Sequence, residues 1–163
     1  MSDTPGPPRS ALRRVSFGAT AAIVTSMALI VGLDAATASR NAIVGSLLII
    51  AIADNLTDAL GVHVYQESER LAPREAFRTT VTNFLARLLA SLSFIGLMLL
   101  VPLPLAICVA IAWGLGLLAV LSLWLARARG VAAVPEIAKH CAVAVAVIAF
   151  SRFIGTWIAH SVG

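Results

Sequence analysis

The chain has 163 residues, of which 60% are hydrophobic and 12% are charged, and its mean hydropathy is +0.95. Soluble domains are about 45–50% apolar and about 25% charged, so this composition excludes an ordinary soluble domain, a disordered chain and a disulfide-stapled module. It also excludes an ordinary nucleic-acid binder, despite the net charge of +4. One bilayer crossing needs about 20 apolar residues. Five crossings therefore leave only short loops and no separate soluble domain.

Five apolar runs follow a polar N-terminal tail. The tail, residues 1–14, contains three prolines and is predicted to be a disordered cytoplasmic segment. The runs cover residues 15–33, 42–64, 79–101, 105–125 and 137–161. Pro102 and Pro104 separate the third run from the fourth, and residues 127–135 are predicted to form a loop. The expected fold is an all-α integral membrane protein with five transmembrane helices.

Lys and Arg residues alternate between rich and poor connections along the chain. The rich segments contain Arg9, Arg13, Arg14, Arg70, Arg74, Arg78, Arg127, Arg129 and Lys139. On the other side the connections carry Arg40 alone. Under the positive-inside rule, this alternation predicts an N-terminus in the cytoplasm. The expected location is the bacterial plasma membrane, and the pI near 10 is mostly a signal of topology.

A signal peptide is the alternative for the first run. Arg13 and Arg14 precede it, and Ala36, Thr37 and Ala38 resemble a small-residue cleavage site. The run of about 19 residues exceeds the usual signal core of about 7–15, which favours a retained helix. The run also carries a stripe of small residues that permits close helix contact, a candidate dimer interface: Gly18, Ala22, Ser26 and Gly32.

Four charged residues lie deep inside the runs, at bilayer depth, where a charge costs at least about 2.5–3.5 kcal/mol on insertion scales. They are Asp54, Asp58, Arg87 and Arg152. Asp54 and Asp58 are four residues apart and share one helical face. Two such carboxylates repel unless a cation stands between them or one of them is protonated. They are therefore the candidate metal or proton site, with a hard cation such as manganese or ferrous iron.

The alternative is that arginines neutralise both acids. Counting about 1.5 Å per residue from the cytoplasmic end of each run places Asp58 and Arg87 about 10 and 12 Å deep. The same count places Asp54 and Arg152 about 16 and 22 Å deep. This hypothesis pairs Asp58 with Arg87 and Asp54 with Arg152, as buried ion pairs that hold the helices in register.

The connection between the second and third runs carries candidate accessory metal ligands, Glu67 and Glu69, and His63 lies just before it. The acids alternate with arginines, which also suits a solvated, salt-bridged linker. His63 lies on the helical face opposite Asp54 and Asp58, so a joint site on this helix alone is geometrically poor.

Two segments resemble a known family. Residues 16–33, SFGATAAIVTSMALIVGL, are similar to the first transmembrane helix of the vacuolar iron transporter (VIT) family, which typically reads FGxxDGLVTxxxxVxG. Residues 51–69, AIADNLTDALGVHVYQESE, look like its second helix, which has AD or AG, a small polar residue, Met, then Gly with an acid, Tyr and Ser. The five spans and the cytoplasmic N-terminus also agree.

The resemblance implies a homodimer whose facing first and second helices line a pathway for ferrous iron or manganese, exchanged for protons. Asp54 matches an Asp present in many members, whereas Ala21 stands at the first-helix Asp and Asp58 at the second-helix Met. The family's cytoplasmic metal-binding helices are reduced here to residues 65–78. The chain is thus similar to a short, divergent member that lacks that domain.

Two functions follow from these observations. The first is proton-coupled transport of manganese or ferrous iron, with no permanently bound cofactor. The second is a transport-inactive structural or partner-binding membrane protein in which the acids are paired with arginine. An enzyme is not expected, because the sequence offers no nucleophile with a base, no phosphate-binding loop and no zinc signature.

Overall fold

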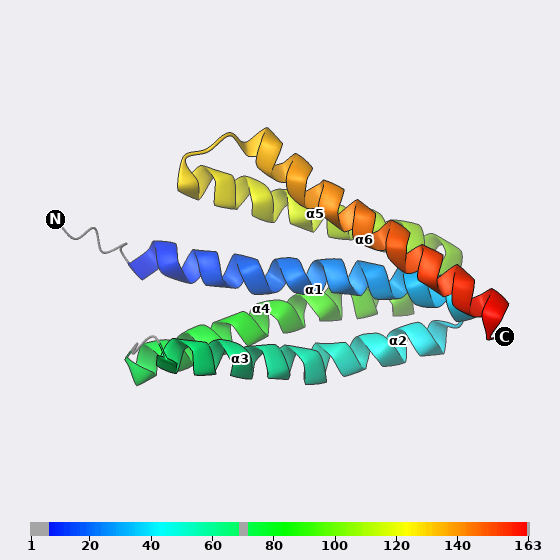
Figure 1. Cartoon of the computed structure of the whole chain (residues 1–163), viewed down its shortest axis with the longest axis horizontal. Coiled ribbons are helices and arrows are strands. Elements are labelled where there is room, and N and C mark those ends of the chain that lie inside the picture. The colour runs from blue at the N-terminus through cyan, green and yellow to red at the C-terminus, as the bar shows by residue number, and fades with distance from the viewer. Residues whose placement is uncertain (1–6, 69–71, 163) are drawn as a thin grey trace.

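The chain forms five long helical stretches that run alternately in opposite directions, with the two termini at opposite ends (Figure 1). The computed structural model describes residues 7–68 and 72–162, with side chains from Gly18 onward. Within these ranges the elements are α1 (Pro7–Thr37), α2 (Arg40–Ile49), η1 (Ile50–Asp54), α3 (Asn55–Ser68), α4 (Pro73–Leu100), α5 (Leu103–Arg129) and α6 (Ala133–Ser161). Because α2, η1 and α3 follow one another without a break, they form a single stretch.

In the described part of the chain, five stretches are long and apolar enough to cross a membrane: Gly18–Thr37, Arg40–Ser68, Pro73–Leu100, Leu103–Arg129 and Ala133–Ser161. The prediction of an all-α fold with five helices long and apolar enough to cross a membrane is therefore confirmed, and the chain fits an integral membrane protein. The helices extend beyond most of the apolar runs, because helical hydrogen bonding continues into the polar flanks.

The N-terminal prediction was partly wrong. Residues 7–14, which were expected to be disordered, form the first turns of α1. Pro7 and Pro8 occupy the first two positions of the helix, where a missing N–H breaks no intrahelical bond and a fixed φ favours the helix. Residues 1–6 of the predicted tail lie outside the described residues.

The break at Pro102 and Pro104 is confirmed, since α4 ends at Leu100 and α5 begins at Leu103. The predicted loop 127–135 is shorter than expected. Gly130 adopts a left-handed φ of 68° and ends α5, the conformation that glycine tolerates best at a helix C-terminus. Pro135 lies in the first turn of α6, where proline does not interrupt the helix.

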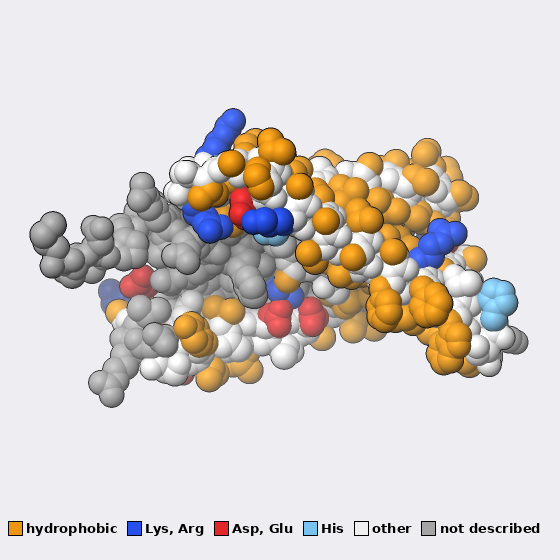
Figure 2. All heavy atoms as spheres, turned by 45° about the horizontal axis from the view of Figure 1, so that its top comes forward, with side chains coloured by type: hydrophobic (Ala, Val, Ile, Leu, Met, Phe, Trp, Pro, Cys, Tyr) orange, Lys and Arg blue, Asp and Glu red, His pale blue; other side chains and the backbone are white. Residues whose placement is uncertain are grey.

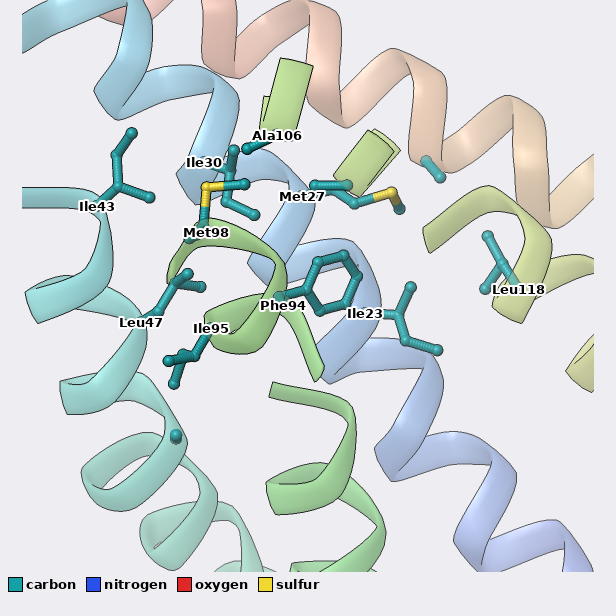
Figure 3. Packing of buried hydrophobic residues seen from close by; sticks show 13 residues of the cluster. Ile23, Met27, Ile30, Ile43, Leu47, Phe94, Ile95, Met98, Ala106 and Leu118 are labelled. Atoms are coloured by element: carbon teal, nitrogen blue, oxygen red, sulfur yellow. The ribbon is translucent and has the colours of Figure 1, made fainter. Parts of the chain in front are cut away.

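Helix α1 is the central helix of the bundle and contacts α2, α4, α5 and α6. The apolar core forms around its second half, where Ile23, Met27 and Ile30 meet Phe94 and Met98 of α4 (Figure 3). These side chains are almost completely buried. Figure 2 shows hydrophobic side chains over much of the outer face, as expected of helices that contact lipid or other helices.

The small-residue stripe of the first run packs inside the chain instead of lying free for a dimer. A Cβ on Gly18 would overlap Asn83 of α4. A Cβ on Gly32 would lie 3.3 Å from the Ser151 carbonyl oxygen of α6, and Gly155 abuts the Gly32 backbone. Small residues thus let α1 approach both neighbours closely.

Candidate functional site

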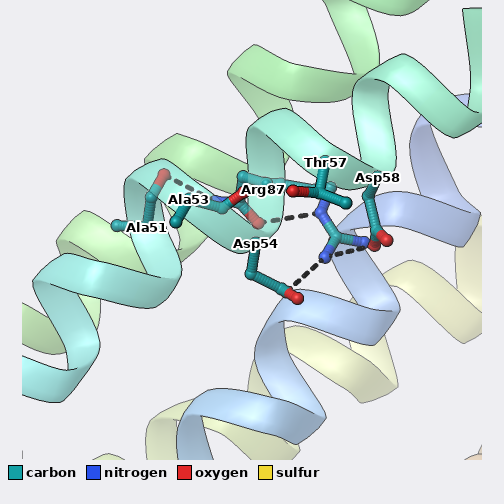
Figure 4. Close-up of polar contacts among 7 residues, drawn as sticks. Ala51, Ala53, Asp54, Thr57, Asp58 and Arg87 are labelled. Carbon is teal, nitrogen blue, oxygen red and sulfur yellow. Dashed lines mark hydrogen bonds and ion pairs between the residues drawn. The ribbon is translucent and has the colours of Figure 1, made fainter.

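Arg87 lies in the middle of α4, and its side chain is only 3% exposed. Its Nη2 lies 3.1 Å from Asp54 Oδ2 and 2.6 Å from Asp58 Oδ2. Its Nε donates to Asn55 Oδ1 at 2.8 Å. One guanidinium therefore binds both carboxylates and the amide between them in the sequence (Figure 4). We call Asp54, Asn55, Asp58 and Arg87 the ionic centre.

Asn55 connects the ionic centre to the unusual helix geometry beside it. In an α-helix the Asn55 N–H would donate to Ala51 O, but here it donates to Ile50 O and Ile52 O at the end of η1, a π-helical turn. The side-chain Nδ2 of Asn55 donates to Ala51 O at 3.0 Å instead. Asn55 is fully buried, so its amide satisfies both the carbonyl of the irregular turn and Arg87.

The two carboxylates are open on their outer side. Asp54 and Asp58 each have side chains that are 48% exposed, and both bind Arg87 through Oδ2. In the part of the chain that the structure describes, neither Oδ1 has a partner. With both acids ionised, two negative charges face one positive charge. The ionic centre then carries a formal charge of −1 in the middle of the spans.

The predicted pairing was half right. Arg87 binds Asp58 as expected, but it also binds Asp54, which had been assigned to Arg152. Arg152 is exposed on α6 and has no acidic partner among the described residues. Gly18 packs near Arg87, whereas Gly32 packs against Ser151. These glycines are fourteen residues apart on α1, about 21 Å, so Arg152 lies too far along the bundle to reach Asp54.

The accessory metal ligands are only partly brought together. His63 Nε2 lies 3.5 Å from Glu67 Oε1, and its Nδ1 lies 3.4 Å from Thr80 Oγ1 of α4. Glu69 lies outside the described residues. Among the described residues, no three His, Cys, Asp or Glu side chains lie together as a metal-binding group. Where a bridging cation would stand between Asp54 and Asp58, the structure places the Arg87 guanidinium.

Uncharged polar residues also line the buried side of α4, and Asn83 and Ser91 among them were not predicted from the sequence. Within the described residues, four buried oxygens lack a hydrogen-bond partner: Ser26 Oγ, Gln66 Oε1, Asn83 Oδ1 and Ser91 Oγ. Asn83 and Ser91 lie one turn before and one turn after Arg87, on the same helical face. This four-residue spacing is the sequence signal that connects them to Arg87.

A serine–histidine contact was also missed. His140 Nδ1 of α6 lies 2.7 Å from Ser122 Oγ of α5. Ser122 Oγ also lies 2.6 Å from Leu118 O of its own helix. The pair therefore connects α5 and α6.

An apolar groove of about 390 Å³ lies between α3 and α4. It is lined by Leu56, Thr57, Ala59, Leu60, His63, Phe77 and Thr80. Most of its α3 lining, His63 included, lies on the helical face opposite Asp58, so the groove is separate from the open carboxylates. Comparison of the chain with protein-family models, curated proteins and solved structures finds no match. The similarity to the VIT family stays a prediction from the two quoted segments.

Proposed function

We propose that this chain is inserted in the bacterial plasma membrane with its N-terminus in the cytoplasm. Five apolar helices support insertion. The basic residues support the orientation, because those at the start of α1, at the start of α4 and around the α5–α6 connection lie at one end of the bundle. Arg40, at the start of α2, lies at the opposite end, as the positive-inside rule requires.

We propose a structural and partner-binding role for the ionic centre, in preference to transport or catalysis. The observation that carries this proposal is the Arg87 guanidinium, which binds Asp54 and Asp58 together. It occupies the position between the carboxylates that a transported divalent cation would need. The three side chains hold α3 against α4, and the open carboxylate oxygens face outward for another helix.

Proton-coupled transport of manganese or ferrous iron by a homodimer is the second candidate. It is favoured by the half-exposed carboxylates at mid-span and by the uncompensated negative charge. The π-helical turn η1 at this place is also relevant, because such turns occur frequently at functional sites. In this transport mechanism, a proton or a metal ion would displace Arg87 from one of the two carboxylates.

Metal uptake by proteoliposomes separates the two candidates. We expect wild-type vesicles to take up manganese and ferrous iron no faster than empty vesicles, and to move no protons when either metal is added. Asp54→Asn, which retains the Asp58–Arg87 pair, provides the matched control. Metal-dependent proton flux that disappears in this variant while its helix content stays unchanged would overturn the structural proposal in favour of transport.

A further inference from the structure

The ionic centre is incomplete on its outer side. Arg87 is covered, but the two carboxylates are half-exposed and keep one oxygen each without a partner among the described residues. With both acids ionised, and resting on the proposed membrane role, the described side chains leave one net negative charge at this place near mid-bilayer. A charge at this depth is expensive next to lipid, and such groups face protein or water. We therefore expect this side of η1 and α3 to be covered.

The surroundings of the carboxylates suit a helix more than open water. Ile52 of η1 and Leu56 and Leu60 of α3 are large apolar side chains that are exposed on the same helical stretch. Gly61, one turn after Asp58, has no atom within 4 Å of the place where a Cβ would stand. Exposed small residues recur every fourth position at Ala53, Thr57 and Gly61. Such a row permits close approach of a second helix.

A second copy of this chain is a poor occupant. A two-fold contact through this face would bring two centres of charge −1 together, since both copies present the same surface. Arg152 is an exposed arginine within an apolar helix, but it lies about 21 Å from Arg87 when the separation is counted along α1. A second copy in the same orientation therefore offers no basic side chain at the required depth from its described residues.

We propose that the outer face of α3 binds a transmembrane helix of a different protein, one that carries a single Lys or Arg near the middle of its span. The cation would bind the open oxygens of Asp54 and Asp58 and complete a neutral set of two acids and two bases. The apolar side chains of that helix would pack against the exposed row of Ala53, Thr57 and Gly61. The charge selects the partner, and the small residues allow the close approach.

Synthetic helices test this inference with the full chain in phosphatidylcholine vesicles. The probes are Leu/Ala helices with a central Lys, with a central Gln, or with the Lys moved two turns toward one end. Association is measured by energy transfer between a dye on the chain and a dye on the helix. We expect the central-Lys helix to associate at an about tenfold lower peptide-to-lipid ratio than the other two.

Single substitutions at the acids provide the sharpest comparison. Asp54→Asn and Asp58→Asn each retain one ion pair with Arg87 but make the centre neutral, so both should lose the preference for the central-Lys helix. Glu67→Gln, an acid-to-amide change on the same helix outside mid-span, should keep it. Equal association of Lys and Gln helices, or a preference that survives Asp54→Asn, would overturn the inference. Energy transfer between two labelled copies of the chain that is lost in Asp54→Asn or Asp58→Asn would also overturn the inference.

The same samples distinguish this outcome from failure of the proposed function. Circular dichroism and protease protection are measured on each sample before the helices are added. A chain that is helical and protected but shows no Lys preference contradicts only the choice of partner. A chain that does not insert contradicts the membrane role itself, and acid-dependent metal flux contradicts the structural role.

Discussion

At the scale of single residues, Arg87 is the side chain on which the ionic centre depends. An arginine at mid-span is tolerated because Asp54, Asp58 and Asn55 satisfy its nitrogens. The acids in turn need Arg87, because without it two carboxylates would stand four residues apart with no cation between them. Each group thus reduces the cost of burying the others.

We expect Arg87→Gln to lower the free energy of unfolding by about 3 kcal/mol, because it leaves both carboxylates without a counter-charge. Unfolding in mixed detergent micelles, followed by circular dichroism, measures this loss. Arg78→Gln, an exposed site two turns earlier on α4, is the control and should change stability little.

A charge swap tests the pair itself. Asp58→Arg with Arg87→Asp keeps the same net charge and should recover part of the stability lost in Arg87→Gln. No recovery, together with a stable Arg87→Gln variant, would mean that the contacts of Arg87 contribute nothing to folding.

Gly155 shows how backbone contact fixes α6 on α1. A side chain at this position would overlap the Gly32 carbonyl oxygen and crowd Ala35, and backbone cannot move aside as a flexible side chain can. We expect Gly155→Val to lower the free energy of unfolding in the same detergent assay by roughly 1–3 kcal/mol, the cost typical of overpacking. Gly116→Val on α5, which has open space at the Cβ position, should behave like the wild type.

At the scale of elements, η1 determines which residues of the second span face Arg87. A π-helical turn contains more residues per turn than an α-helix, so it shifts the helical faces before and after it relative to each other. Asn55 stabilises this turn through Ala51 O and holds Arg87 with its other amide atom. The irregular turn and the ionic centre are therefore one structural unit.

Asn55→Ala removes both amide bonds, and each buried group left unpaired costs about 1–3 kcal/mol. We expect faster hydrogen exchange at the backbone amides of Ile50 to Asn55, measured by mass spectrometry in detergent. Thr57→Val, which removes an exposed hydroxyl that donates to Ala53 O four residues earlier, should leave the exchange unchanged. Equal exchange in both variants would contradict a role for Asn55 in holding the turn.

At the scale of the whole molecule, α6 is long and apolar enough to cross a membrane, and its two ends lie at opposite ends of the bundle (Figure 1). In a chain without Cys108 and Cys141, we expect Val131→Cys to react with a membrane-impermeant maleimide only from the cytoplasmic side. Ser161→Cys should react only from the outside. Labelling of both positions from the same side would contradict the five-span topology.

The sequence by itself determined the all-α class, the five helices that are long and apolar enough to cross a membrane, and the charged residues within them. Hydropathy identifies spans because burying apolar groups is additive along a segment, and Asp54, Asp58 and Arg87 are conspicuous against that background. The boundaries near Pro8 and Pro135 were less certain from sequence, since proline ends helices in their interior yet fits their first turn.

The pairing within the centre was decided only by the tertiary structure. A depth count along straight spans assigned Arg152 to Asp54, because it ignores how each helix packs and assumes a regular second span. In the fold, α6 crosses α1 through Gly32 and Gly155, which carries Arg152 away from the centre, and η1 interrupts the regular helix directly before Asn55. Helix register depends on close contacts between residues far apart in the chain, and hydropathy contains no information about them.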